Sequence, residues 1–350
     1  MRASDAETAA VAFITCLTVC PVVGAACQRF AILDHPGPLK IHKRPIPRLG
    51  GIAIAVAVSV AMLVAGRFEI QPSLTAAAFA LVWFTGLLDD VRPLTPSARL
   101  ISQIVAAFLL WRAGYAFPNV IGELPSLIGT IIVVIVLTNS WNFVDGSDGL
   151  AAGVAAIAAL AFFVAPGQAQ SSMGAPLAVS VAAACAGFLI WNFPPAKIFM
   201  GDAGSTLLGF AIALFTLDFY RSNSASLPVA LFPVSVAALP LLDAVLAIVR
   251  RFRQAQSLVR GDRDHSYDVL LARGWRPRNV ALAFFVLTAV LSGVGWLAVF
   301  TKRTMFLLPG AIVMAGVTAT AILLGTLGGS AKTAEHERSA PEVISSRSAS

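Results

Sequence analysis

Apolar runs long enough to cross a membrane alternate with short polar segments along most of this 350-residue chain. A membrane span takes about 20 apolar residues, and charged residues or Pro/Gly clusters bound each run. The pattern therefore predicts an all-α polytopic membrane bundle of about eleven transmembrane helices. Ten is the alternative, because the uncharged stretch from 150 to 192 is divided only by turn residues at 166–172. The eleven runs are 8–30, 50–66, 73–88, 99–117, 124–141, 150–165, 175–192, 204–220, 227–249, 279–300 and 304–327.

The same pattern sets the domain organisation. Residues 1–328 are expected to form one transmembrane catalytic domain, and 329–350 a disordered cytoplasmic tail, because the tail is polar and rich in Ser, Ala and Glu. The first run is long for a signal peptide, so we expect a retained helix. The predicted cytoplasmic loops are 31–49, 89–98, 139–149, 193–203 and 250–278.

Composition supports a membrane protein. The chain is 57% hydrophobic and 12% charged, with a mean hydropathy of +0.81, and soluble domains carry about twice that share of charge. A water-soluble enzyme, a disordered protein and a fibrous repeat are therefore excluded. The four cysteines lie in apolar runs without metal-ligand spacing, so they are expected to be packing residues.

The net charge of +7 indicates orientation and not nucleic-acid binding. With eleven spans, alternate loops lie on opposite faces, and all but six of the 25 Lys and Arg residues fall on one face. Cytoplasmic loops carry the excess of positive charge, so that face is predicted to be cytoplasmic. The six exceptions are Arg2, Arg67, Arg112, Arg221, Lys302 and Arg303.

Five aspartates are predicted to lie together at the cytoplasmic membrane boundary: Asp89 and Asp90 after the third run, Asp145 and Asp148 after the fifth, and Asp202 after the seventh. A carboxylate at the centre of a membrane helix costs about 2.5–3.5 kcal/mol, and less near its ends. Such a cluster is tolerable when a divalent cation or a cationic group neutralises it. Ligation by oxygen alone favours Mg²⁺, with Mn²⁺ as the alternative.

Glycines flank these aspartates in DGSDG and GDAGS, each just before a predicted helix. Backbone N–H groups and the positive end of a helix dipole then face the loop and suit a phosphate. For either loop alone, a simple N-cap with a glycine turn is an equal alternative. Two such loops beside an aspartate pair favour a functional site.

Basic residues complete the candidate site. The loop LDHPGPLKIHKRPIPRLGG has four prolines, which favour an ordered strap over a helix. We assign its Lys40, His42 and Arg48 to a lipid phosphate. Plain positive-inside topology or headgroup binding is the alternative for the basic residues of 250–278, and a lone histidine is weak evidence. Asp243 is either a helix-packing partner or part of the site, and Asp218 with Arg221 is expected to form an ion pair at the other face.

Four segments occur in order between the predicted helices: DHPGPLKIHKRPIPRLGG, GLLDDVRPL, NSWNFVDGSDGLAAG and WNFPPAKIFMGDAGSTLLG. Together they resemble the polyprenyl-phosphate N-acetylhexosamine-1-phosphate transferases. That family includes the phospho-N-acetylmuramoyl-pentapeptide transferase of peptidoglycan synthesis and the N-acetylglucosaminyl-1-phosphate transferases that start O-antigen and related glycans. The match is specific, because four separate loops agree in order and spacing.

The resemblance implies an enzyme in the bacterial cytoplasmic (inner) membrane, with its active site on the cytoplasmic face. It would use Mg²⁺ to transfer an N-acetylhexosamine 1-phosphate from a UDP-sugar to undecaprenyl phosphate, releasing UMP, in the first membrane step of a surface polysaccharide. We also allow for a homodimer. The implied roles are catalysis for Asp89, Asp90 and His265, metal ligation for Asp202 and Asp145, and nucleotide-sugar binding for Asn142, Asp148, Phe199 and Arg263, with Phe199 on the uracil.

One loop departs from the family pattern. The peptidoglycan enzymes carry three consecutive histidines and the N-acetylglucosamine enzymes a His-x-His-His, whereas this chain has Arg263-Asp264-His265-Ser266-Tyr267-Asp268. This argues against the muramoyl-pentapeptide substrate and resembles the branch that starts O-antigen or capsule repeats. Tyr267 or Arg263 are then candidate replacements for the other histidines.

Three rival functions were weighed. A cation-coupled transporter is disfavoured because the acids lie at one face and not near the midplane. A CDP-alcohol phosphotransferase matches from Asp145 to Ala152, but Gly153 stands where its motif needs Arg. A binding or scaffold protein leaves the cost of the carboxylates unexplained.

Overall fold

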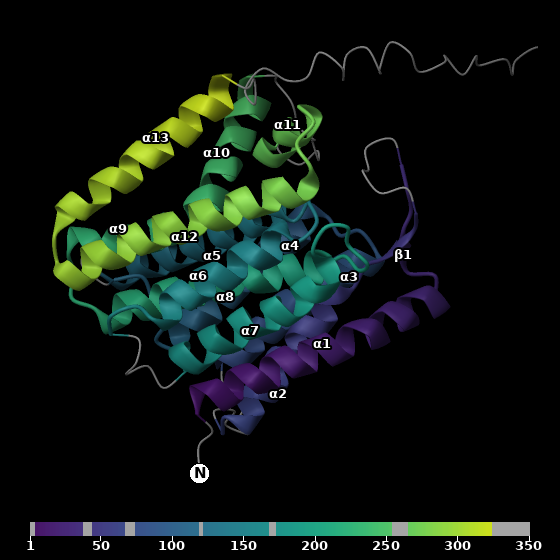
Figure 1. Cartoon of the computed structure of the whole chain (residues 1–350). Coiled ribbons are helices and arrows are strands. Elements are labelled where there is room, and N and C mark those ends of the chain that lie inside the picture. Colours follow the sequence, from purple (N-terminus) through teal and green to yellow (C-terminus); the bar gives the residue numbers. More distant parts are fainter. Residues whose placement is uncertain are drawn as a thin grey trace, which may run out of the picture.

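The computed structural model describes residues 4–37, 44–66, 74–118, 122–167, 173–253 and 265–323, and each of the eleven predicted runs is helical over most of its described residues (Figure 1). The ninth run forms two helices, and a short helix precedes the tenth. The helices are α1 (Asp5–Arg29), α2 (Gly50–Val64), α3 (Leu74–Val91), α4 (Pro96–Arg112), α5 (Glu123–Val144), α6 (Leu150–Phe163), α7 (Gly174–Asn192), α8 (Asp202–Ser222), α9 (Leu227–Val236), α10 (Ala238–Arg253), α11 (Ser266–Ala272), α12 (Pro277–Thr301) and α13 (Leu307–Leu323).

Length and composition confirm a polytopic membrane bundle. Six helices, α1, α3, α5, α7, α8 and α12, are long and apolar enough to cross a membrane, and α9 with α10 makes a seventh span if the bent pair is counted as one. Shorter apolar helices, including α2 and α6, pack among them. Large hydrophobic side chains remain exposed along α1, α4, α5 and α12, as expected where lipid is the solvent.

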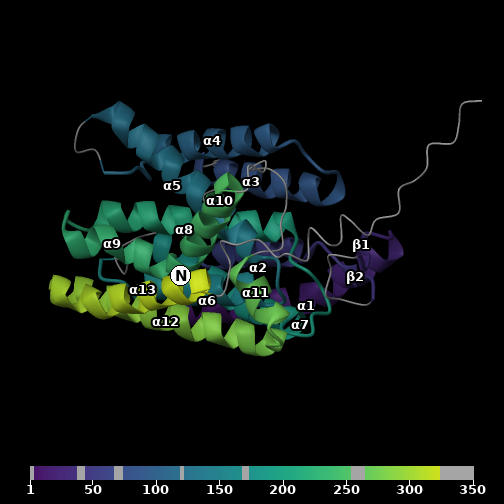
Figure 2. The ribbon, with the colours of Figure 1, turned by 90° about the horizontal axis from the view of Figure 1, so that it is seen from above.

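The centre of the bundle is α8. Buried residues make up 94% of its most apolar stretch, against 22–67% in the other long helices. It packs against α3 and α5 on one side and against α2 and α6 on another, and Figure 2 shows it between these groups. The first residue of α8 is Asp202, so the fold places this carboxylate in the middle of one end of the bundle. We call this end the site end.

The prediction of one helix over 227–249 was wrong. The chain bends by 73° between α9 and α10, and the break falls at Ala237 between Pro233 and Pro240. A proline cannot donate a helical hydrogen bond, but it is tolerated in the first turn of a helix, where Pro240 now lies. In consequence α10 points away from α9 and approaches the site end (Figure 1).

The proline-rich loop after α1 is ordered at both ends. β1 (Leu33–Asp34) pairs antiparallel with β2 (Ile46–Pro47), and Arg48 continues into a parallel bridge with Phe199. The predicted strap therefore joins the segment that leads into α8. Residues 38–43, with Lys40 and His42, lie outside the described part of the chain.

A close glycine contact seats α2 on the start of α8. The N–H of Gly51 donates to the carbonyl of Met200 at 2.8 Å. A Cβ at position 51 would meet the backbone N and Cα of Gly204, which cannot move aside as a flexible side chain can.

We predict that Gly51→Ala lowers the free energy of unfolding by about 1–3 kcal/mol, the usual cost of overpacking. Thermal unfolding in detergent micelles measures the effect. Gly293→Ala is the matched control, because nothing lies within 4 Å of a Cβ there and Ala favours helix. Equal melting temperatures for Gly51→Ala and wild type would contradict the close packing.

Candidate functional site

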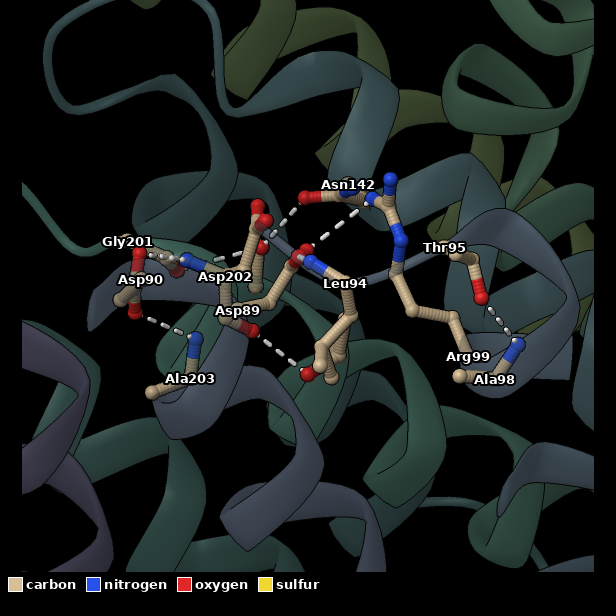
Figure 3. Close-up of polar contacts among 12 residues, drawn as sticks. Asp89, Asp90, Leu94, Thr95, Ala98, Arg99, Asn142, Gly201, Asp202 and Ala203 are labelled. Atoms are coloured by element: carbon tan, nitrogen blue, oxygen red, sulfur yellow. Dashed lines mark hydrogen bonds and ion pairs between the residues drawn. The ribbon is translucent and has the colours of Figure 1, made fainter. Parts of the chain in front are cut away.

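The carboxylate of Asp90 caps the N-terminus of α8 from a different helix. Its two oxygens accept the N–H groups of Asp202 and Ala203, each at 2.9 Å (Figure 3). Arg48 also donates to it, at 3.2 Å. Gly201 precedes Asp202 and Ala203 with φ +74°, and a Cβ there would meet the Asp90 oxygens. Glycine therefore suits this position both sterically and conformationally, and Asp90 satisfies N–H groups that the helix itself leaves unpaired.

Asp89 is turned toward α4 and the first residue of α8. One oxygen accepts the N–H of Leu94 at 2.6 Å, and the other lies 3.1 Å from the guanidinium of Arg99. A side-chain hydrogen bond also links Asp89 to the Asp202 carboxyl group, and Figure 3 shows these two residues next to each other. Two acidic side chains thus stand side by side, with Asp89 buried and Asp202 half-buried.

The loop after α5 adds two more acids. Asp145 ends α5, and the electrostatic fields of Asp202, Asp90 and Asp148 reach it. Burial, and then repulsion from these three carboxylates, raises the pKa of Asp145 well above its usual value. Asn142, one turn earlier, accepts the hydroxyl of Ser205 in α8 at 2.7 Å. These contacts fasten the end of α5 to the start of α8.

A buried amide links the two glycine loops. The Oδ1 of Asn192 accepts the N–H of Gly149 at 3.0 Å, and its Nδ2 donates to the carbonyl of Ile198 at 2.8 Å. Asp148 accepts the N–H of Ala196 at 2.9 Å. The loop that carries Asp145 is thereby held against the segment that leads to Asp202.

The strap lies against the segment that contains Phe199. The N–H of Phe199 donates to Pro47 at 2.8 Å, and its carbonyl accepts the N–H of Gly50 at 2.9 Å. Arg48 lies at the same point and reaches Asp90. The strap, the aspartate pair and the Phe199 segment are thus connected through backbone and side-chain bonds.

These segments surround a cavity of about 1030 Å³ at the site end. Its lining includes six of the predicted residues: Arg48, Asp90, Asp145, Asp148, Phe199 and Asp202. Basic side chains share it: Arg44, Lys197, Arg276 and Arg278. A space of this size, lined by both acidic and basic side chains, suits a multiply charged phosphate compound.

The other six predicted residues lie outside the described lining of the cavity or cannot be placed. Asn142 and Asp89 are not among the lining residues but contact them: the carbonyl of Asn142 accepts the N–H of Asp145, and Asp89 bonds to Asp202. His265 is at the start of α11 and contacts Asp243. Arg263, like Lys40 and His42, falls outside the described residues.

Sequence reasoning missed three polar partners. Arg99 was counted only as a positive-inside residue, yet it pairs with Asp89. Asn192 and Tyr267 were not assigned to linking the loops. The signal for Asn192 was its place in WNFPPAKIFMGD, a segment already singled out, but only the fold brings it to Gly149.

Metal ligation was tested against the geometry. Among the residues described, no three His, Cys, Asp or Glu side chains are arranged to hold an ion alone. Asp145 and Asp202 nevertheless both line the cavity, and the charge of Asp202 reaches Asp145. Mg²⁺ is commonly held by one or two carboxylates together with substrate phosphates and water, and this donor set fits that mode.

Comparison with known proteins agrees with this architecture. The family model for glycosyl transferase family 4 matches residues 72–220. The chain is 33% identical over 341 residues to the decaprenyl-phosphate N-acetylglucosaminephosphotransferase of Mycolicibacterium smegmatis, covering 85% of this chain and 82% of that protein. It is 29% identical over 295 residues to a probable undecaprenyl-phosphate N-acetylglucosaminyl 1-phosphate transferase of Bacillus subtilis, covering 81% of each. Identity to the Escherichia coli undecaprenyl-phosphate alpha-N-acetylglucosaminyl 1-phosphate transferase is 27% over 297 residues, covering 78% of each.

We predict that Asn192→Ala loosens both glycine loops, because it leaves the N–H of Gly149 and the carbonyl of Ile198 without their buried partner. A loss of about 1–3 kcal/mol corresponds to at least about fivefold faster amide exchange in segments 145–150 and 193–199. Hydrogen–deuterium exchange with mass spectrometry measures it. Asn223→Ala is the control, since Asn223 also bonds to two backbone groups, donating to the carbonyls of Pro166 and Phe219 at the other end of α8. Unchanged exchange in both segments would contradict the link.

Proposed function

Because the chain belongs to glycosyl transferase family 4, among the polyprenyl-phosphate N-acetylhexosamine-1-phosphate transferases, we propose that its cavity joins a UDP-N-acetylhexosamine to undecaprenyl phosphate. The products are undecaprenyl-diphospho-N-acetylhexosamine and UMP. The observation that carries the proposal is the convergence of Asp90, Asp145 and Asp202, from three separate segments, on one cavity lined by cations.

The charge balance of the site supports phosphate transfer. When one phosphate attacks another, anions are brought together and need screening. The cavity supplies Arg44, Arg48, Lys197, Arg276 and Arg278. A neutral metabolite has no use for this number of cations beside buried carboxylates.

Asp202 and Asp145 are the residues that would hold Mg²⁺. Their mutual repulsion and burial cost free energy without a cation. The bound ion would neutralise developing charge on the donor diphosphate. The remaining contributions come from the protein's own groups.

Asp90 and Asp89 position different groups of the site. Both oxygens of Asp90 accept backbone N–H groups of α8, and one also accepts from Arg48. Asp90 therefore orients Arg48 toward the lipid phosphate and fixes the start of α8. Asp89 stands beside Asp202 and pairs with Arg99, so it supports the metal-binding carboxylate. Lys40 and His42 of the strap are proposed to reach the same lipid phosphate.

Phe199 and the loop after α5 are proposed to hold the nucleotide. Phe199 lines the cavity with its backbone fixed at both ends, which presents its ring for stacking on uracil. Asn142 and Asp148 orient the two glycine loops, and Arg263 is proposed to contact the donor. The sugar tested first is N-acetylglucosamine, because the relatives are named for it.

We place the protein in the bacterial cytoplasmic membrane with this cavity facing the cytoplasm, since the site end carries most of the basic loops. UDP-sugars are made on that side. The proposed role is the first membrane step of a surface polysaccharide of the O-antigen or capsule type. A homodimer remains part of the proposal.

The direct test is UMP release by purified protein given Mg²⁺, undecaprenyl phosphate and a panel of UDP-N-acetylhexosamines. We expect UMP with at least one sugar, loss of UMP in EDTA and recovery with Mn²⁺. Ion flux from ion-loaded liposomes that contain the protein is measured for comparison. Ion flux without UMP from any sugar would favour a transporter and overturn the proposal.

We predict that Asp202→Asn lowers UMP release by at least about 100-fold, because the site loses a ligand and a charge. Asp218→Asn is the matched control. Asp218 is buried at the opposite end of the same helix and pairs with Arg221 at 2.7 Å. UMP release by Asp202→Asn within threefold of the control would remove Asp202 from the metal site.

A further inference from the structure

A carboxylate in α10 holds the segment that leads into α11. Asp243 is 1% exposed, and its Oδ2 lies 2.6 Å from Nδ1 of His265. Its Oδ1 accepts both the backbone N–H and the hydroxyl of Ser266, at 2.8 and 2.6 Å. A buried carboxylate needs such donors, and here two successive residues provide them.

The imidazole of His265 is restrained on its faces as well as at its edge. The ring of Tyr267 is parallel to it within 4°, with centroids 5.4 Å apart, and the ring of Phe143 lies 5.7 Å away. The Tyr267 hydroxyl in turn donates to the carbonyl of Phe143 at 3.0 Å. The imidazole therefore has little freedom to rotate.

The cluster formed by Asp243, His265 and Tyr267 contacts the loop after α5, which is part of the candidate site. Phe143 lies between Asn142 and the loop of Asp145, and the Tyr267 hydroxyl is packed against Gly146. The guanidinium of Arg251 stands over the Phe143 ring at 5.6 Å. Neither Asp243 nor His265 is among the residues that line the described cavity, so any effect of Asp243 on the reaction passes through His265 and the neighbours that contact the loop after α5.

Hydrogen bonding at one ring nitrogen determines the state of the other. A carboxylate that accepts from Nδ1–H fixes that proton, and Nε2 is then the basic nitrogen. Carboxylates orient imidazoles in this way in nucleophile–base systems and in metal sites.

We propose, on the basis of the proposed function, that Asp243 is a positioning residue that keeps the His265 proton on Nδ1. Nε2 of His265 is then the nitrogen that exchanges a proton or hydrogen bond with the substrate phosphates. The bend at Ala237 is what brings Asp243 to His265, because it directs α10 toward the loop after α5.

Steady-state kinetics of UMP release give the first test. Asp243→Asn keeps the size of the side chain but removes the charge that selects the tautomer. We expect kcat to fall about 100-fold, within the range for proton-transfer groups, with both KM values changed by less than threefold. The kcat of His265→Gln should fall by as much, and the kcat of the double variant should fall no further than that of either single variant. Asp218→Asn is the control, with kcat unchanged.

A kinetic result of the opposite kind would overturn the proposal. If Asp243→Asn loses activity while His265→Gln keeps it, Asp243 does not act through the histidine. A loss of kcat of threefold or less in Asp243→Asn would also overturn the proposal. A rise in KM with kcat unchanged would indicate a structural anchor for the loop.

Nitrogen NMR of ¹⁵N-histidine-labelled protein tests the pair without activity. The chain has four histidines, and His265→Gln identifies the signal of His265. We expect a protonated Nδ1 in wild type and a mixture of tautomers in Asp243→Asn. An Nε2–H tautomer in wild type overturns the proposal, and this holds even if Asp243→Asn fails to fold. If wild type releases no UMP, the proposed function fails, while this spectrum still decides the Asp243–His265 pair.

Discussion

The N-terminus of α8 is buried, and its unpaired N–H groups must be satisfied inside the protein. No side chain of the preceding segment does so, because the N-cap is Gly201. Asp90 provides the acceptors from the end of α3 instead. A buried helix end without partners costs several kcal/mol in a membrane protein. The junction of α3 with α8 therefore determines where the remaining elements lie, including α2 at Gly51 and the strap at Phe199.

This arrangement has an electrostatic consequence. Capping α8 in this way places Asp89 and Asp90 beside Asp202, and the Asn142–Ser205 bond draws the Asp145 loop to the same point. Like charges in a medium of low dielectric repel strongly. Burial and this repulsion together raise the pKa of Asp145. The helix-capping geometry and the gathering of carboxylates thus have one origin, and the site follows from the packing of the bundle.

Much of the fold was predictable, because each membrane span is a local property of the sequence. Each of the eleven runs is helical over most of its described residues, and the five aspartates lie at helix ends or in the loop after α5, at one end of the bundle. The bend at Ala237 and helix α11 were not predicted, since Pro233 and Pro240 leave the direction of the following helix open. The pairings Asp89–Arg99 and Asp243–His265 join residues in different segments, and only the tertiary packing selects such partners.

The central claim is that Asp202 and Asp145 share one divalent cation with the donor diphosphate. Crystals grown with Mn²⁺ and a UDP-N-acetylhexosamine test it through the anomalous signal of manganese. The account predicts one manganese peak within coordination distance of both carboxylates and of the diphosphate. A peak at another site, or nucleotide bound in the cavity with no manganese beside Asp202 and Asp145, would contradict it.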